Sequence, residues 1–193
     1  IITNARDNVA KFINANPEKI IFTSSGSASN SLVIKGVPSE NQRINKYKIF
    51  YSPTAHKSMI EASKSCLYNE SLKVDKYGYI NLEYLEYILS NSKLKPFVCV
   101  EFANSEIGTI NNIIAISKLV HQYNGILLAD ATGYIPSFKI DIASLENIDF
   151  LSFSGHKLGA LKGIGVLYIN KKVTLKPLIY GSQEKSLFAG TEN

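Results

Sequence analysis

The sequence predicts an α/β sandwich built on a mostly parallel sheet, and two patterns support this prediction. Short apolar runs of strand length alternate with stretches of helical periodicity along the chain, which is typical of a sheet packed against helices. One of these runs, Phe97–Ala103, is almost continuously apolar, as expected for a strand that is buried on both faces. We therefore expect helices on both sides of the sheet.

The composition indicates one folded domain, residues 1–193. Hydrophobic residues make up 45% of the 193 residues, which is enough to bury a core. The formal net charge is +5, but the basic residues occur in ones and twos and form no stripe, so we expect no nucleic-acid binding. The first residues lack a signal-peptide pattern, and no apolar run reaches membrane-spanning length. We therefore expect a soluble protein without a membrane partner.

The two cysteines, Cys66 and Cys99, have neither metal-ligand spacing nor the density of a disulfide scaffold. We therefore expect no metal site and a reducing, cytoplasmic location.

The first part of the chain predicts a helix, a strand and a polar turn. Apolar residues from Ala5 to Ile13 recur at helical spacing, and Ile20–Thr23 reads as a short buried strand. Small hydroxyl residues then fill Ser24–Asn30 before a helix-like run, Leu32–Ile34. Free backbone N–H groups at such a helix start bind phosphate. Serine and asparagine are also favoured caps of helices that bind nothing, so the turn alone leaves both readings open.

The next strand, Tyr47–Tyr51, is followed by a polar segment that contains His56 and leads into a helix around Ile60–Ala62. If the strands are parallel, His56 lies at the same edge of the sheet as the first polar turn. A lone histidine is more often structural than catalytic, so its role stays open here. Leu72–Val74 predicts a further short strand, and Asn81 predicts the N-cap of a structural helix.

The strand Phe97–Ala103 is followed by a loop, an amphipathic helix from Ile113 to Tyr123, and the strand Ile126–Ala129, which leads directly into Asp130. A carboxylate that ends an apolar strand is costly unless it meets a cation or several donors. Asp130 is therefore a candidate functional residue.

A polar loop that contains Lys157 joins the last two predicted strands, Phe150–Phe153 and Val166–Ile169. A lysine at the carboxyl end of a buried strand lies where α/β sheets bind ligands. Desolvation can remove its proton, so that the amine attacks a carbonyl and forms a Schiff base with pyridoxal 5′-phosphate (PLP). In a lysine-rich chain, an ordinary exposed lysine is an equally good reading of this loop alone.

Together these stretches resemble the cysteine desulfurases of the class V aminotransferase group, which are fold type I, PLP-dependent enzymes. The resemblance covers essentially the whole chain in the family's order and spacing. The matching segments are Ile20–Ser24, Ser29–Asn30, Ile34–Gly36, Thr54–Lys57, Glu106–Thr109, Asp130–Thr132, Ser152–Lys157, Lys162–Gly165 and Gly190–Asn193. The resemblance implies a three-layer sandwich with a mixed, mostly parallel sheet of about seven strands.

The resemblance also implies roles for individual residues. Lys157 would carry PLP as an internal aldimine, Asp130 would meet the pyridinium nitrogen, and His56 would stack on the ring; Lys157 and His56 are the implied catalytic residues. The other implied cofactor-binding residues are Gly26, Ser27, Ser105, Ser154, Gly155, His156 and Thr191. Thr191 would reach the phosphate bound by the other subunit of a homodimer.

The implied activity is formation of an aldimine with L-cysteine, or a similar amino acid, and transfer of its sulfur as a persulfide to a sulfur-acceptor protein. Such sulfur mobilisation serves iron–sulfur cluster biogenesis. Two alternatives stay open: a degenerate or truncated PLP-fold protein that binds without catalysis, and another class V aminotransferase or lyase.

The chain also departs from the family pattern. Ser105 and Gly133 stand where the family has an asparagine and a glutamine that contact the ring's phenolic oxygen, and Phe188 stands in place of an arginine. The family's N-terminal segment and C-terminal domain have no counterpart in the sequence. Neither Cys66 nor Cys99 matches the cysteine that attacks the substrate sulfur. We therefore expect a truncated large domain that lacks the sulfur-accepting cysteine.

Overall fold

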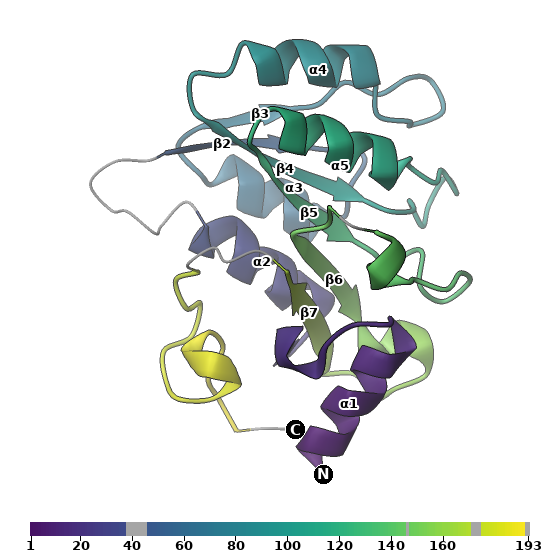
Figure 1. Cartoon of the computed structure of the whole chain (residues 1–193), viewed down its shortest axis with the longest axis vertical. Helices are drawn as coiled ribbons and strands as arrows, with labels where there is room; N and C mark the ends of the chain where they lie inside the picture. Colours follow the sequence, from purple (N-terminus) through teal and green to yellow (C-terminus); the bar gives the residue numbers. More distant parts are fainter. Residues whose placement is uncertain (38–45, 146, 171–174, 192–193) are drawn as a thin grey trace.

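A computed structural model of the protein describes residues 1–37, 46–145, 147–170 and 175–191 (Figure 1). The polar connection that the sequence predicts before the strand Tyr47–Tyr51, residues 38–45, lies outside these ranges, as does the end of the last matching segment, 192–193. The helices are α1 (Ile2–Phe12), α2 (Gly26–Gly36), α3 (Lys57–Lys64), α4 (Leu82–Ser90) and α5 (Ile113–Gln122). The strands are β1 (Ile20–Thr23), β2 (Tyr47–Tyr51), β3 (Asn69–Ser71), β4 (Lys95–Glu101), β5 (Ile126–Asp130), β6 (Phe150–Ser154) and β7 (Gly165–Ile169). Short 3-10 helices are Pro17–Lys19, Ile142–Ser144, Gly155–Leu158 and Glu184–Ser186.

The described strands form one seven-stranded sheet in the order β1-β7-β6-β5-β4-β2-β3. The neighbours from β3 to β6 pair in parallel, whereas β7 is antiparallel to both β6 and β1. Because two antiparallel steps restore the direction, β1 runs the same way as β6. The carboxyl ends of all strands except β7 therefore meet at one edge of the sheet, and the predicted mixed, mostly parallel sheet of about seven strands is confirmed.

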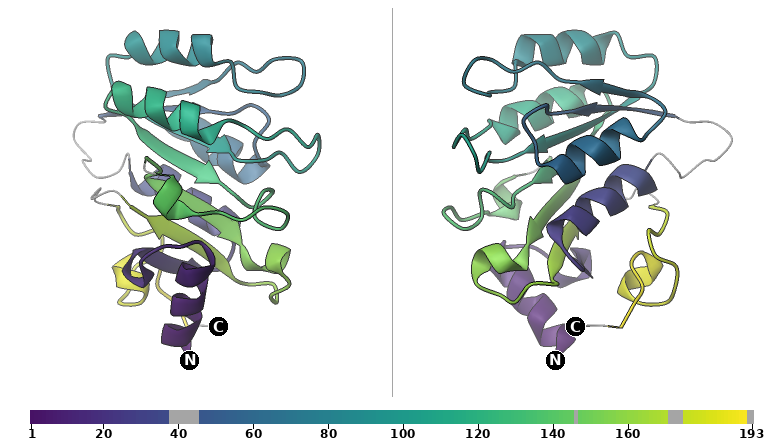
Figure 2. Two further views of the ribbon diagram at one scale, coloured as in Figure 1. Left: turned by 45° about the vertical axis from the view of Figure 1, so that its right-hand side comes forward. Right: turned by 180° about the vertical axis from the view of Figure 1, so that it is seen from behind.

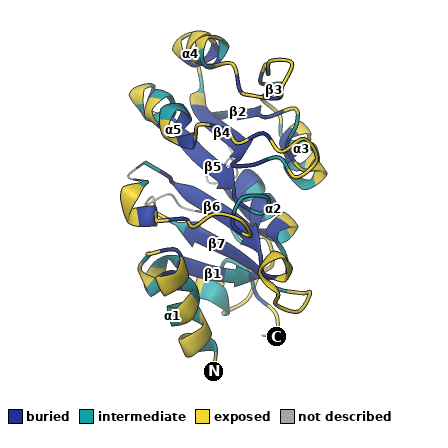
Figure 3. Ribbon diagram, turned by 90° about the vertical axis from the view of Figure 1, so that its right-hand side faces the viewer, coloured by how far each residue is buried: buried dark blue, intermediate teal, exposed yellow. Residues whose placement is uncertain are grey.

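Helices cover both faces of the sheet and complete a three-layer sandwich (Figures 2 and 3). One core lies under α2 and α3, and the other lies under α1, α4 and α5. In β4, Phe97 and Cys99 belong to the first core, while Val98 and Val100 belong to the second. This alternation explains why β4 reads as an uninterrupted apolar run. Within the described ranges no helix is long and apolar enough to cross a membrane.

Three predicted boundaries were wrong. The short strand expected at Leu72–Val74 is β3 at Asn69–Ser71, where pairing with β2 at the sheet edge decides the strand without an apolar pattern. The polar turn expected over Ser24–Asn30 is mostly helical, since α2 already begins at Gly26. The Ser25 side chain accepts a hydrogen bond from Ala28 N–H and caps the helix there. β4 ends at Glu101, two residues earlier than expected.

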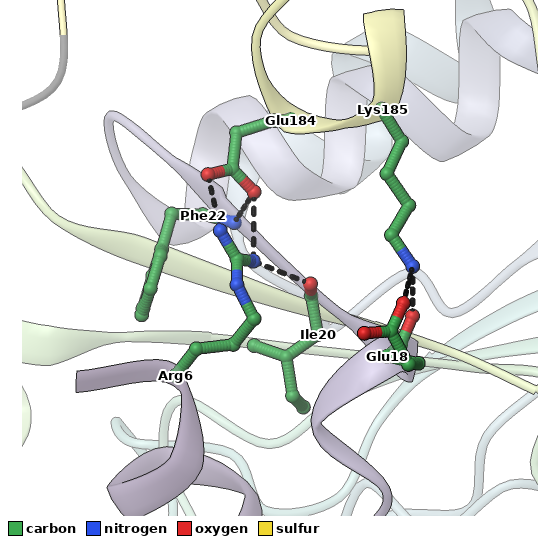
Figure 4. Close-up of polar contacts among 6 residues, drawn as sticks. All are labelled: Arg6, Glu18, Ile20, Phe22, Glu184 and Lys185. Atoms are coloured by element: carbon green, nitrogen blue, oxygen red, sulfur yellow. Dashed lines mark hydrogen bonds and ion pairs between the residues drawn. The ribbon is translucent and has the colours of Figure 1, made fainter. Parts of the chain in front are cut away.

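The segment that follows β7 is tied to the start of the chain by two ion pairs (Figure 4). Arg6 of α1 binds both carboxylate oxygens of Glu184, which also accepts a hydrogen bond from the backbone N–H of Phe22. Lys185 pairs with Glu18 beside it. The backbone φ angles of Glu184, Lys185 and Ser186 are 45°, 59° and 61°, a left-handed turn that costs L-residues about 1–2 kcal/mol each. These contacts hold the strained turn against the edge strand β1.

Candidate functional site

Asp130 ends β5 at the edge of the sheet where the carboxyl ends of the strands meet. The residue is 6% exposed, and its carboxylate accepts hydrogen bonds from the Asn30 side-chain amide at 2.8 Å and from the backbone N–H of Thr132 at 2.9 Å. Both donors are neutral, and no lysine, arginine or histidine of the described chain forms an ion pair with Asp130. A buried anion that has only neutral hydrogen-bond donors would be stabilised by a bound cation.

Asn30 is a site residue that the sequence matched to the family but to which it assigned no role. It lies in α2, is 1% exposed, and accepts a hydrogen bond from the Ser152 hydroxyl at 2.5 Å while it donates to Asp130. Ser152 lies next to Asp130 in the register of β5 and β6 and is fully buried. The available signal was Ser152 between the apolar residues of β6, since buried polar side chains need partners, whereas Asn30 stands among the serines of α2 and nothing local marks it. Asn30 therefore orients the Asp130 carboxylate.

The N-terminus of α2 forms a close contact with the end of β6. The backbone N–H of Gly26 donates to the Ser154 hydroxyl at 2.9 Å. A Cβ atom at Gly26 would lie 2.6 Å from that hydroxyl, so glycine allows the two elements to approach. Ser27 is exposed, and its N–H donates to no residue of the described ranges. The Ser27 N–H and hydroxyl, at the positive end of a helix, suit an anion such as phosphate.

His56 is the N-cap residue of α3 and is exposed. Its Nδ1 atom accepts a hydrogen bond from the backbone N–H of Ser58 at 3.2 Å, and the Ser58 hydroxyl lies 2.8 Å away. Because a backbone N–H can only donate, Nδ1 carries no proton and the neutral ring carries its proton on Nε2. The Ser58 hydroxyl is also 3.4 Å from the amide of Asn30. A chain of contacts therefore joins His56 to Asp130 through Ser58 and Asn30.

Lys157 lies in the 3-10 helix Gly155–Leu158, directly after β6. Gly155 is buried, with its N–H bonded to the Ile164 carbonyl at 2.9 Å, whereas His156 and Lys157 are exposed. The side chain of Lys157 has no partner among the described residues. Its exposure differs from the desolvation that the sequence suggested, because Lys157 follows the buried strand β6 and lies in the exposed turn after it.

Two further predicted residues, Ser105 and Thr191, are exposed, and neither forms a hydrogen bond or ion pair with the site residues described above. Gly133 leaves no room for the glutamine of the family pattern, since a Cβ atom there would lie 2.5 Å from the carbonyl oxygen of Ala103. The neighbour of Ser105, Asn104, uses its side-chain amide to donate to the Thr54 carbonyl at 2.6 Å. The structure thus assembles the ring-nitrogen and phosphate sides of the predicted site more fully than the side expected for the phenolic oxygen.

Neither cysteine is presented as a reactive thiolate. Cys99 is fully buried in β4, and this burial raises the pKa of its thiol well above the ordinary value. Partial burial also raises the pKa of Cys66, and the nearby Lys35 offsets only part of that effect. Both residues fit structural thiols better than nucleophiles.

The assembled residues match the groups of PLP one by one. Asp130 offers an anion for the pyridinium nitrogen, Ser27 and the α2 terminus offer donors for a phosphate, and Lys157 offers an amine at the same edge. The absence of a side chain at Gly26 lets the end of β6 pack against the helix start. On this donor set, the residues present fit the cofactor.

Comparison with known proteins identifies the family of the chain. The sequence profile of the family described as Aminotransferase class-V matches residues 1–191. The chain is 37% identical over 200 residues to the mitochondrial cysteine desulfurase of Saccharomyces cerevisiae, covering 98% of this chain and 39% of that protein. It is 36% identical over 200 residues to the cysteine desulfurase IscS of Dictyoglomus turgidum, covering 100% of this chain and 49% of that protein.

Solved structures show the same relationship. A NifS-like protein superposes with a TM-score of 0.91 at 32% identity, covering 100% of this chain and 54% of the other. SspA in complex with cysteine superposes with a TM-score of 0.87 at 29% identity, covering 99% of this chain and 56% of the other. The chain spans between 39% and 56% of the length of these relatives. With the profile match over nearly its whole length, the chain belongs to the aminotransferase class V family, among relatives that are cysteine desulfurases.

Proposed function

We propose that this chain is the PLP-binding part of a cysteine desulfurase and that Lys157 carries the cofactor. One observation carries the proposal: the buried Asp130 carboxylate, held by Asn30 and Thr132, lacks a cationic partner within the described ranges. It lies at the sheet edge to which Lys157 and the α2 terminus also belong. When bound, PLP supplies an electron sink for negative charge that develops on the substrate.

The chain's own residues would bind and orient the cofactor. Asp130 would hold the proton on the ring nitrogen by a charge-assisted hydrogen bond, and Asn30 would keep the carboxylate in place. Ser27 and Ser154 would bind phosphate oxygens. His56 would present its Nε2–H toward the site, since its Nδ1 accepts the hydrogen bond from the backbone N–H of Ser58.

The substrate and partners follow from the relatives and belong to the same proposal. L-Cysteine is the proposed substrate, because the named relatives are cysteine desulfurases, and a sulfur-acceptor protein is the proposed recipient of its sulfur. We also propose a homodimer in which Thr191 contacts the cofactor of the other subunit; the exposure of Thr191 supports this. Light scattering of the purified chain measures the oligomeric state.

The test of the cofactor assignment is covalent capture. The purified chain is incubated with PLP, its absorbance spectrum is recorded, and borohydride then fixes the cofactor on the lysine that holds it. We expect a new absorbance band and a modified peptide that contains Lys157. The exposed Lys162 in the same loop provides the control: Lys162→Ala should keep the band and Lys157→Ala should lose it. A spectrum unchanged by Lys157→Ala would refute the assignment.

A further inference from the structure

Glu101 ends β4 directly beside Asp130. The two residues are register partners in the parallel pair of β4 and β5. Two positions earlier, Cys99 and Leu128 both belong to the core under α2 and α3. Because side chains alternate along a strand, Glu101 and Asp130 point to that same face at the carboxyl edge. The site therefore contains a second carboxylate next to the one that the sequence identified.

The environment of Glu101 leaves half of its carboxylate without a partner. The residue is 5% exposed. Its Oε1 atom accepts a hydrogen bond from the Thr54 hydroxyl at 2.7 Å, while Oε2 is buried without a hydrogen-bond partner in the described chain. An unsatisfied buried oxygen destabilises a fold, and an apolar residue of similar size would avoid that cost. The arrangement thus points to a role that appears when the site is filled.

The two carboxylates together make this edge of the sheet strongly favourable for a cation. Neighbouring strands lie about 4.8 Å apart, and neither Glu101 nor Asp130 forms an ion pair with a basic side chain of the described ranges. The hydrogen-bond donors around them, the Asn30 amide, the Thr132 N–H and the Thr54 hydroxyl, are all neutral. A single positive charge bound beside Asp130 would therefore interact with both anions at low dielectric.

We propose that Glu101 is a second counter-charge for the protonated ring nitrogen of PLP and acts through space beside the direct contact of Asp130. This inference rests on the proposed function, since it takes PLP as the ligand. Thr54 holds the Glu101 carboxylate in place, and the negative charge of Glu101 favours the pyridinium form of the ring. Glu101 thereby adds to the preference of the site for a cationic heteroaromatic ring over a neutral one.

The experiment compares PLP with its 1-deaza analogue, in which a C–H group replaces the ring nitrogen and no cation can form. Dissociation constants of both ligands are measured by equilibrium dialysis for the full chain and its variants. Glu101→Gln keeps an oxygen for the Thr54 hydroxyl and removes the charge. We expect it to weaken PLP binding about tenfold, or roughly 1.4 kcal/mol, and to leave binding of the analogue unchanged.

Three further single variants and one double variant separate the effect of charge from that of structure. Glu83→Gln removes the same charge from an exposed position of α4 and should change neither affinity. Thr54→Val keeps the charge of Glu101 and removes the hydrogen bond that holds its carboxylate, so it should weaken PLP binding less than Glu101→Gln does and leave binding of the analogue unchanged. Asp130→Asn should retain part of the preference for PLP over the analogue, and adding Glu101→Gln should abolish that remainder.

The outcomes are distinct. Equal loss of PLP and analogue in Glu101→Gln would overturn the proposal and make Glu101 an anchor for Thr54. Unchanged affinity for both would show that its charge does not reach the ring. If Glu101→Gln does not fold, the Asp130→Asn variant tests the proposal. If that variant loses all preference for PLP over the analogue, Glu101 is not a second counter-charge. A wild-type chain that binds neither ligand would instead refute the proposed function itself.

Discussion

Removal of Arg6 should destabilise the protein far more than removal of Lys185, although both residues pair with a glutamate in the same region (Figure 4). Arg6 donates to the two carboxylate oxygens of Glu184 at 2.9 and 2.7 Å and to the Ile20 carbonyl at 2.6 Å. The side chains of Arg6 and Glu184 are 20% and 6% exposed, against 48% and 82% for Lys185 and Glu18. Loss of Arg6 therefore leaves a nearly buried carboxylate without its counter-charge.

The expected magnitude follows from this difference in burial. Breaking a fully buried pair on one side costs about 3–5 kcal/mol. Because Arg6 keeps some contact with water, and Glu184 keeps the hydrogen bond from Phe22 N–H, we expect about 2–4 kcal/mol for Arg6→Met. The exposed Lys185–Glu18 pair should contribute about 0.2–1 kcal/mol to the free energy of unfolding, so Lys185→Met is the matched control.

Urea-induced unfolding of the wild type, both single variants and Glu184→Gln measures the free energies of unfolding. A double-mutant cycle of Arg6→Met and Glu184→Gln should give a coupling energy of about 0.5–3 kcal/mol. Limited proteolysis should also show earlier cleavage between residues 181 and 191 in Arg6→Met, since the left-handed turn at Glu184–Ser186 loses its anchor. Equal, small losses of unfolding free energy in Arg6→Met and Lys185→Met would refute the reasoning that burial sets the strength of the Arg6–Glu184 ion pair.

Three other results are expected. Asn30→Ala should lower the free energy of unfolding by about 2–4 kcal/mol, because it removes the acceptor of the buried Ser152 hydroxyl and leaves Asp130 with only the hydrogen bond from Thr132 N–H; Ser58→Ala, which loses a 3.4 Å contact to Asn30 and an exposed contact to His56, should cost clearly less, and equal losses would contradict this account. Since burial raises the pKa of Cys66 and Cys99, both are thiols at pH 7, so alkylation of Cys66 should be slow there and accelerate as the pH rises, while Cys99 should react only on unfolding; rapid labelling of either at pH 7 would contradict it. The isolated chain loaded with PLP should release little sulfide or alanine from L-cysteine, because neither thiol is positioned as a nucleophile, and robust turnover abolished by Cys66→Ser or Cys99→Ser would show that the nucleophile was misplaced.

Much of the architecture was readable from local patterns. The strands β1, β2 and β4 could be predicted from their continuous apolar runs, because a strand buried on both faces needs apolar residues at successive positions. Asp130 was identified because a carboxylate is costly at the end of such a strand. The same rule applies to Glu101, which the sequence analysis did not single out. The predicted strand ran on to Ala103, so Glu101 stood inside it and not at its end, where the structure places it.

The residue types at the strand ends could be predicted from local patterns, since hydrophobic periodicity and polar turns are properties of short segments. Which of these residues meet depends on the folded chain. Asn30 reaches Asp130 across 100 residues, and Arg6 reaches Glu184 across 178 residues. Such pairs depend on strand order, on register and on how closely a helix packs against the sheet, and neither partner carries a local pattern that names the other. For the same reason, the exposure of Lys157 and the unpartnered oxygen of Glu101 became visible only once the chain was folded.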